Sequence, residues 1–130
     1  MPHTENYYIA TDFDGTLCNE IKFPGIGSPK PLLKILIDLK HDLPNLKIIL
    51  WTNRTGSSLE AAKQWCKDQG LEIDRVNENH PDVFTWLHSD PRKVFANLFL
   101  DDRAFGYREP SYEELRALIE GGERIIDTKA

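Results

Sequence analysis

The sequence predicts an α/β fold: a single Rossmann-like domain with a parallel sheet and helices on both of its faces. Short runs that are apolar throughout alternate with longer segments of helical periodicity, a pattern typical of parallel sheets covered on both sides. The 130 residues match the usual size of one domain, and no repeat or linker divides them. We therefore expect one catalytic domain over residues 1–130.

Strands are expected where apolar and β-branched residues form runs of strand length. Residues 7–11, 46–51 and 97–100 are such runs, and residues 73–76 are expected to form a short further strand. Residues 124–126 are predicted to add an edge strand. Residues 83–87 fit either a helical turn or a strand, and the sequence leaves that choice open.

Helices are expected in three segments with apolar residues at helical spacing. The first runs from Pro31 to near Pro44, with Ser28 as a candidate cap. The second contains Leu59 and Cys66 and is predicted to stop at Gly70. The third begins near residues 110–114, ends at residues 121–122, and is expected to bury a stripe of three apolar side chains: Leu115, Leu118 and Ile119.

Composition and charge disfavour several classes of binding partner and several cellular locations. The net charge of −5 and the pI of about 5.3 disfavour binding to long nucleic acid or to an anionic membrane. No apolar run is long enough to span a bilayer, and the N-terminus has no apolar leader segment. Cys18 and Cys66 are read as reduced thiols. These features predict a cytoplasmic protein.

Acidic residues follow two of the predicted strands. Asp12 and Asp14 come after the first strand, and Asp101 and Asp102 come after residues 97–100. Because the carboxyl ends of parallel strands meet at one edge of the sheet, we expect these side chains to converge there with Thr52. Clustered carboxylates repel one another unless a cation neutralises them, and Mg²⁺ prefers carboxylate ligands, water and phosphate oxygens.

The same residues resemble the signatures of the haloacid dehalogenase-like (HAD) phosphatases. The run from Asp12 to Leu17 is similar to the first signature, and Thr52 matches the second. Lys93 is the best match to the third, with Arg92 beside it as the other candidate, and Asp101-Asp102 matches the fourth. The signatures occur in family order, and the gaps between them are too short for a cap domain. The chain thus resembles the small capless members of the superfamily.

The resemblance implies a Mg²⁺-dependent phosphatase or phosphotransferase, a phosphoric monoester hydrolase. By resemblance, Asp12 is the covalent nucleophile and a metal ligand, and Asp14 is the general acid and base that also binds metal through its backbone carbonyl. Asp101 and Asp102 complete the implied metal site. Thr52 and Lys93 are implied to hold the phosphoryl group.

Other residues near these signatures are candidates for substrate contact. Asn53, Arg54 and Arg103 follow strand ends, and arginine suits recognition of anions, although a surface salt bridge explains either arginine equally well. We expect a small phosphorylated metabolite as substrate and a homo-oligomer that closes the site. The alternatives are a low-turnover Mg²⁺-binding interaction module and a phosphatase acting on a macromolecule. Dehalogenation is disfavoured, because that chemistry needs no metal cluster.

Overall fold

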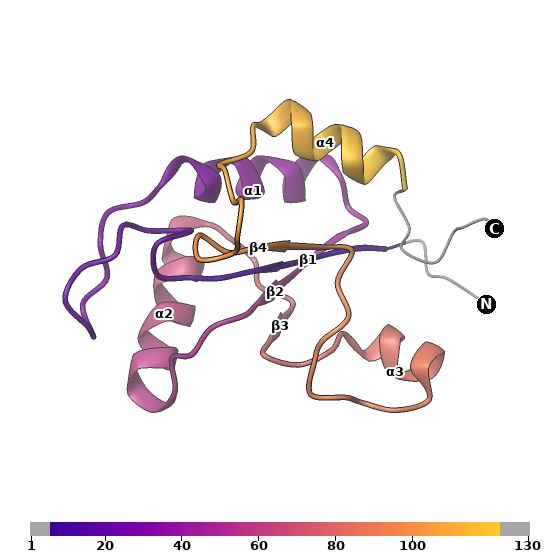
Figure 1. The fold of residues 1–130 in the computed structure, drawn as a ribbon, viewed down its shortest axis with the longest axis horizontal. Helices are drawn as coiled ribbons and strands as arrows, with labels where there is room; N and C mark the ends of the chain where they lie inside the picture. Colours follow the sequence, from indigo (N-terminus) through magenta and orange to yellow (C-terminus); the bar gives the residue numbers. More distant parts are fainter. Residues whose placement is uncertain (1–5, 123–130) are drawn as a thin grey trace.

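Four parallel strands form a sheet in the order β3-β2-β1-β4. The computed structural model, which describes residues 6–122 apart from the side chain of Trp86, places β1 (Tyr7–Thr11) between β2 (Leu46–Leu50) and β4 (Leu98–Leu100) (Figure 1). β3 (Arg75–Val76) lies beyond β2. The predicted fold class is confirmed. The strand expected at residues 124–126 lies outside the described residues.

The order of the strands reverses at β1. The chain runs from β1 to β2 and β3 on one side and then crosses back to place β4 on the other side. In open parallel sheets, such a switch point leaves a crevice beyond the carboxyl ends of the two strands that flank it. Loops that leave β1 and β4 therefore begin side by side, although 86 residues separate Thr16 from Asp102 in the sequence.

Helices cover both faces of the sheet, as expected. α1 (Pro31–Asp42) and α4 (Tyr112–Glu120) lie on one side of the strands, and α3 (Pro81–Leu87) lies on the other (Figure 1). α2 (Gly56–Gln69) contributes Ala62 and Cys66 to the core cluster that α1 and α4 share. Segment 83–87, for which the sequence allowed either a helix or a strand, is helical. Pro81 starts this helix, and the N–H of the second helical residue donates to the His80 ring.

Two helix ends match their predictions and two details do not. Gly70 ends α2 with a left-handed φ of 96°, and Ser111 forms a capping box with Glu114 at the start of α4. Ser28 does not cap α1: the N-cap is Lys30, and the Ser28 hydroxyl accepts a bond from Asn19 instead. Leu118 is 37% exposed, so the buried stripe of α4 consists of Leu115 and Ile119.

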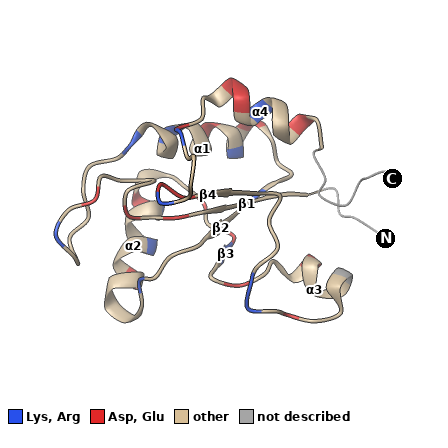
Figure 2. Ribbon diagram, in the orientation of Figure 1, with Lys and Arg blue, Asp and Glu red and all other residues tan. Residues whose placement is uncertain are grey.

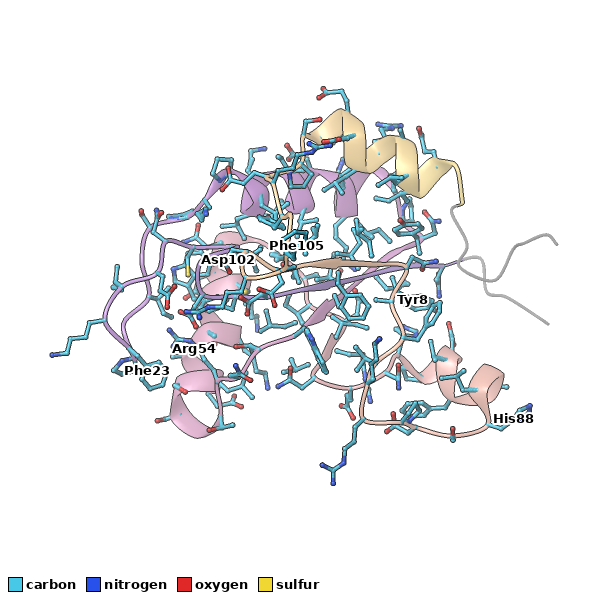
Figure 3. The ribbon with its side chains drawn as sticks, viewed as in Figure 1. Tyr8, Phe23, Arg54, His88, Asp102 and Phe105 are labelled. Carbon is cyan, nitrogen blue, oxygen red and sulfur yellow. The ribbon has the colours of Figure 1, made fainter. Side chains whose placement is uncertain are left out.

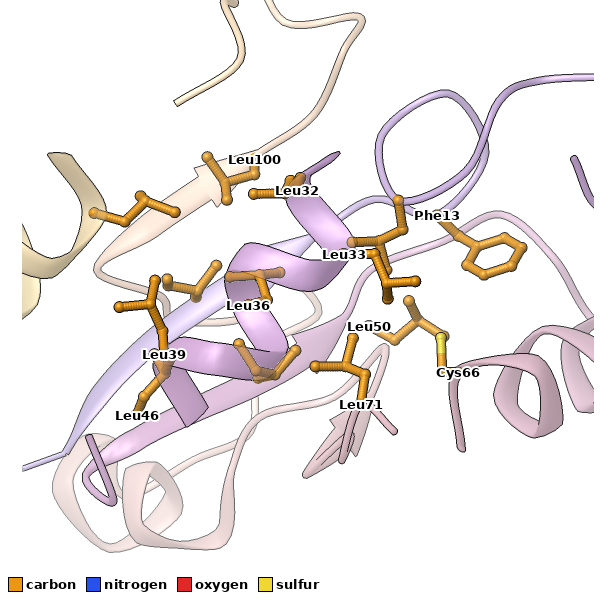
Figure 4. Packing of buried hydrophobic residues seen from close by; sticks show 14 of the residues in the cluster. Phe13, Leu32, Leu33, Leu36, Leu39, Leu46, Leu50, Cys66, Leu71 and Leu100 are labelled. Atoms are coloured by element: carbon orange, nitrogen blue, oxygen red, sulfur yellow. The ribbon is translucent and has the colours of Figure 1, made fainter. Parts of the chain in front are cut away.

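The main core lies between the sheet and helices α1, α2 and α4. Leu36 and Leu39 of α1 are fully buried against Ile9 and Ile48 of the sheet, and Cys66 and Leu71 close the cluster at the α2 end (Figure 4). Each fully buried leucine contributes roughly 1.5–3 kcal/mol through removal of apolar surface from water. This cluster holds β1 and β2 in position, and the functional side chains follow directly from those strands.

A smaller cluster covers the opposite face under α3. Tyr8, Ile49 and Val83 belong to it, and the Tyr8 ring makes an edge contact with Phe95 at 5.9 Å between centroids. No helix within residues 6–122 combines the length and the apolar character that a membrane span requires.

We predict that Leu36→Ala lowers the free energy of unfolding by about 2–5 kcal/mol, because it leaves a cavity between α1 and the sheet. Leu118→Ala is the matched control, since it removes the same atoms from a helix surface and should cost less than about 1 kcal/mol. Urea unfolding monitored by circular dichroism measures both values. Equal losses in the two variants would show that α1 is not packed on the core as described.

Candidate functional site

Three carboxylates meet beyond the carboxyl ends of β1 and β4. The backbone N–H of Asp12 donates to the Leu100 carbonyl at 2.8 Å, which fixes the end of β1 against β4. Asp12, Asp101 and Asp102 each offer an oxygen atom, and these atoms lie within 4.8 Å of one another. Acidic and basic segments lie close together in the loops that follow the two strands (Figure 2). The predicted convergence of Asp12 with the Asp101-Asp102 pair is thus present.

The environment of Asp12 disfavours a negative charge. Burial raises the pKa of Asp12 to about 7, and the nearby carboxylates of Asp101 and Asp102 add to the shift, although a hydrogen bond from the Phe13 backbone opposes it. A cation within the cluster would reverse this balance, because it would compensate all three carboxylates at once. The oxygen-only donor set therefore fits a hard divalent cation such as Mg²⁺.

Asp102 is held by the residues that follow Asp14. The Thr16 hydroxyl donates to Asp102 Oδ1 and accepts from the Asp102 N–H, both at 3.0 Å. Gly15 has a φ of +85°, and a Cβ atom at this position would lie 2.6 Å from Asp102 Oδ2. Gly15 and Thr16 were visible in the sequence motif, but their contact with Asp102 was not predicted.

Asp101 is oriented by its own loop. The Arg103 N–H donates to Asp101 Oδ1 at 2.9 Å, so a short turn after β4 fixes this carboxylate. The Arg103 side chain is exposed and reaches Glu20 at 3.4 Å, which links this turn to the loop after β1. Arg103 therefore borders the site, and its predicted substrate contact stays a prediction.

Asp14 is paired with Arg54. Arg54 Nε donates to Asp14 Oδ2 and Arg54 Nη2 donates to Asp14 Oδ1, both at 2.8 Å, in a bidentate arrangement. The Arg54 side chain is 2% exposed, and the hydrogen bonds to Asp14 raise the pKa of its guanidinium further. The charge of Asp14 is thus compensated within the protein, and its side chain is not part of the three-carboxylate cluster.

The remaining N–H groups of Arg54 fix two other segments. Arg54 Nη1 donates to the carbonyls of Pro24 and Ser58, and Nη2 also donates to the Gly25 carbonyl. All five N–H groups of the guanidinium are therefore used within the protein. A contact between Arg54 and the substrate, which the sequence predicted, would require one of these hydrogen bonds to break.

Two adjoining cavities open onto Asp12. One has a volume of about 420 Å³ and is lined by Asp14 and by the loop of residues 20–23, and the other, of about 510 Å³, is lined by Trp51 and Asn77. Four residues line both cavities and mark the centre of the site: Asp12, Thr52, Asn53 and Asp101. A larger cavity of about 680 Å³ between α2 and β3 contains none of the predicted site residues.

The positive side chain at the second cavity is Arg92. Arg92 and Lys93 are both exposed, but only Arg92 lines that cavity together with Asp12, and Lys93 lines neither of the two cavities. The sequence favoured Lys93 for the phosphoryl-binding role and left Arg92 as the other candidate; the structure brings Arg92 to the cavity beside Asp12, and the role itself stays a prediction. The segment is irregular, so the side chain that faces the site could not be read from periodicity.

A buried asparagine positions this segment. Asn79 is 0% exposed, donates to Asp90 Oδ1 at 3.0 Å, and accepts from the Phe95 N–H at 2.6 Å. It therefore clamps both ends of the loop that carries Arg92. Sequence analysis did not single out Asn79, because a lone asparagine gives no signal that it will be buried.

Thr52 is fixed by a reciprocal bond with the next strand. The Thr52 N–H donates to Asn77 Oδ1 and the Thr52 carbonyl accepts from Asn77 Nδ2, both at 2.8 Å. The Thr52 hydroxyl oxygen accepts from the Arg54 N–H at 3.1 Å. Thr52 lines both cavities beside Asp12, and its phosphoryl-binding role stays a prediction.

Lys30 also reaches the loop after β1. Its ammonium group donates to the Gly15 carbonyl at 2.9 Å and pairs with Glu109 at 2.9 Å. This contact joins the start of α1 to the Asp14-Gly15 turn and to the loop after β4. Sequence reasoning missed it, because Lys30 lies outside every recognised motif.

We predict that Gly15→Ala lowers the free energy of unfolding by more than Gly70→Ala does. Both glycines have a left-handed φ, at +85° and +96°, so each substitution costs about 1–2 kcal/mol in backbone strain. Only Gly15→Ala also displaces Asp102 and breaks its bonds with Thr16, because no atom lies within 4 Å of the added Cβ at Gly70. Urea unfolding measures the difference, and equal losses would contradict the described packing.

Comparisons with known proteins agree with this architecture. No protein-family model matches the chain, and no curated protein matches it. Among solved structures, the chain is similar to a conserved protein from Bacteroides thetaiotaomicron, with 32% sequence identity and a TM-score of 0.72. The similarity covers 94% of this chain and 96% of the other. The chain therefore belongs to the same family as this conserved Bacteroides thetaiotaomicron protein.

Proposed function

We propose that the chain is a Mg²⁺-dependent phosphomonoester hydrolase of the haloacid dehalogenase-like type, with Asp12 as the covalent nucleophile. The observation that carries this proposal is the meeting of Asp12, Asp101 and Asp102 at the centre of two open cavities. A buried arginine compensates the fourth carboxylate, Asp14, in the same region. This arrangement resembles the signature residues of that superfamily in both kind and order.

The three clustered carboxylates would hold the metal ion, with the backbone carbonyl of Asp14 as a further ligand by resemblance. The donor set supports Mg²⁺ because it consists of oxygen atoms alone, and Mg²⁺ sites commonly combine a few carboxylates with water and phosphate. When bound, the ion would neutralise the carboxylates and the phosphate oxygens, so that Asp12 remains ionised beside an anionic substrate.

In the first step, an oxygen of Asp12 attacks phosphorus and the bond between phosphorus and the ester oxygen breaks, which gives an aspartyl-phosphate. The Thr52 hydroxyl and the Arg92 guanidinium bind the phosphoryl oxygens and stabilise the charge that they carry. Asp14 in its protonated form gives a proton to the departing alcohol oxygen.

In the second step, water attacks the aspartyl-phosphate and transfers a proton to the Asp14 carboxylate. The bond between Asp12 and phosphorus breaks, which releases inorganic phosphate and restores the Asp12 carboxylate. Arg54 occupies one acceptor position on each Asp14 oxygen, and a carboxylate offers about four. Positions therefore remain for the transferred proton, while Arg54 keeps the carboxyl group in a fixed orientation.

We predict that the purified protein hydrolyses 4-nitrophenyl phosphate when Mg²⁺ is present and stops when EDTA removes it. Asp12→Asn should lower kcat by roughly a thousandfold or more while the protein stays folded, because the change removes the attacking oxygen anion and keeps the shape. Release of 4-nitrophenolate and a circular dichroism spectrum measure the two effects. Turnover that survives in EDTA would rule out the metal-dependent mechanism.

The same measurements separate an enzyme from a metal-binding interaction module. Mg²⁺ that raises the melting temperature without any turnover of small or macromolecular phosphates would favour a metal-binding interaction module. Turnover restricted to macromolecular phosphates would support the phosphatase mechanism but contradict the small substrate that we propose.

We predict that Arg92→Ala lowers kcat/KM on the order of a hundredfold, whereas Lys93→Ala changes it by less than about threefold. The reason is that Arg92 lines the cavity beside Asp12 and Lys93 does not. Removal of one charge-stabilising donor usually has an effect of this size. Steady-state kinetics on a generic aryl phosphate provide the comparison. A larger loss of kcat/KM in Lys93→Ala than in Arg92→Ala would assign the phosphoryl-binding role to Lys93.

We also propose a cytoplasmic location and a second copy of the chain that covers the open site. The location is supported by Cys18 and Cys66, which are both free and buried in the core and form no disulfide with each other. The homo-oligomer is supported by the openness of both cavities toward solvent. Size-exclusion chromatography with light scattering tests it, and a strictly monomeric protein would contradict it.

A further inference from the structure

Two exposed apolar side chains border the cavity that contains Asp12 and Asp14. Ile21 is 50% exposed and Phe23 is 63% exposed, although both are large and apolar. They line the cavity of about 420 Å³ together with Asp12 and Asp14. An apolar wall beside a polar catalytic floor is typical of sites that bind a ligand with one charged end and one apolar end.

Phe23 is held in a fixed position by Arg54. The guanidinium carbon of Arg54 lies 5.2 Å from the centroid of the Phe23 ring and 5.2 Å from that of the Phe13 ring. Phe13 is fully buried and in edge contact with Trp65. Figure 3 shows Phe23 beside Arg54 at the outer end of the loop. Because Arg54 is itself fixed by five hydrogen bonds, this cation–π contact orients the Phe23 ring before any ligand arrives.

The backbone of the same loop is closed on itself. The Asn19 N–H donates to the Ser28 carbonyl at 2.8 Å, and the Gly25 N–H donates to the Lys22 carbonyl at 2.9 Å. A Cβ atom at Gly27 would lie 2.1 Å from the Asn19 carbonyl oxygen, so the two arms of the loop touch. A ligand that contacts Phe23 would therefore lose little free energy to ordering of the loop.

The same cavity is also lined by an ion pair. Glu20 and Arg103 form an ion pair at 3.4 Å that joins the loop after β1 to the loop after β4. Both residues line the cavity. The cavity thus has a polar floor at Asp12, an apolar wall at Ile21 and Phe23, and a charged rim between the two loops.

We propose that Ile21 and Phe23 form a subsite for the leaving group of the substrate, and that this group is flat and aromatic or similarly apolar. The proposal rests on the phosphatase function proposed above. Hydroxyl groups of a sugar would lose hydrogen bonds to water on this wall and find carbon atoms in their place. An aromatic group would instead remove apolar surface from water on both partners and stack on the Phe23 ring.

The test compares two substrates whose alcohols have similar acidity but differ in aromatic area: phenyl phosphate and 2-naphthyl phosphate. Wild-type protein with Mg²⁺ should hydrolyse 2-naphthyl phosphate with a kcat/KM on the order of tenfold higher. Phe23→Ala should bring this ratio close to one, and Phe23→Leu should retain part of it. Phe105→Ala is the matched control, because Phe105 is a fully exposed phenylalanine that does not line the cavity.

A binding measurement separates this subsite from the phosphatase chemistry. Phenylphosphonate and 2-naphthylphosphonate carry no cleavable ester, and isothermal titration with Mg²⁺ gives their affinities. Tighter binding of the naphthyl compound that is lost in Phe23→Ala supports the subsite even if no ester is hydrolysed, and in that case the phosphatase proposal fails alone. A naphthyl preference that is absent in wild type, or that Phe23→Ala leaves unchanged, overturns the subsite while hydrolysis itself stands.

Discussion

The guanidinium group of Arg54 is the constraint on which the site depends. It is buried, and its five hydrogen bonds reach Asp14, the loop carbonyls of Pro24 and Gly25, and the Ser58 carbonyl at the start of α2. Breaking a buried ion pair by removing one partner usually costs about 3–5 kcal/mol. Arg54 therefore sets the position of one catalytic candidate and of the loop that borders the cavity at the same time.

This arrangement also divides the acidic charge of the site into two parts. Asp14 has a protein cation as its partner, whereas Asp12, Asp101 and Asp102 face one another with no described cation among them. The protein thus compensates one carboxylate through Arg54, whereas burial, with the nearby carboxylates of Asp101 and Asp102 adding to it, raises the pKa of Asp12. The three uncompensated carboxylates therefore favour binding of a divalent cation at the switch point between β1 and β4.

The sequence was sufficient for β1 and for the end of α2, which depend on local residue composition. β1 was predicted at residues 7–11, and its end places Asp12 at the sheet edge because the carboxyl ends of parallel strands lie together. Gly70 was found because a left-handed helix end favours glycine. The Ser28 cap was wrong because Asn19 binds the Ser28 hydroxyl, and that contact depends on how the loop closes.

Side chains in irregular segments were harder to place from the sequence, because their contacts also depend on how the loops close. Arg54 could be identified as a residue beside the site, but two of its carbonyl partners, Pro24 and Gly25, lie about thirty positions away in the sequence and carry no side-chain signal. The choice between Arg92 and Lys93 depends on Asn79, which clamps the loop from inside the protein. Contacts of this kind are decided by tertiary packing and not by residue type.

The shortness of the outer strands has a consequence for the behaviour of the chain at high concentration. β3 has two residues and β4 has three, so the sheet edges formed by the described residues offer few unpaired backbone groups. Arg75 of β3 also forms an ion pair with Glu78, which follows the strand. Short and charged edges are poor templates for the addition of a strand from another molecule. Among the described residues, the two longer strands, β1 and β2, thus lie inside the sheet, and the short strands β3 and β4 offer little backbone for pairing with another molecule.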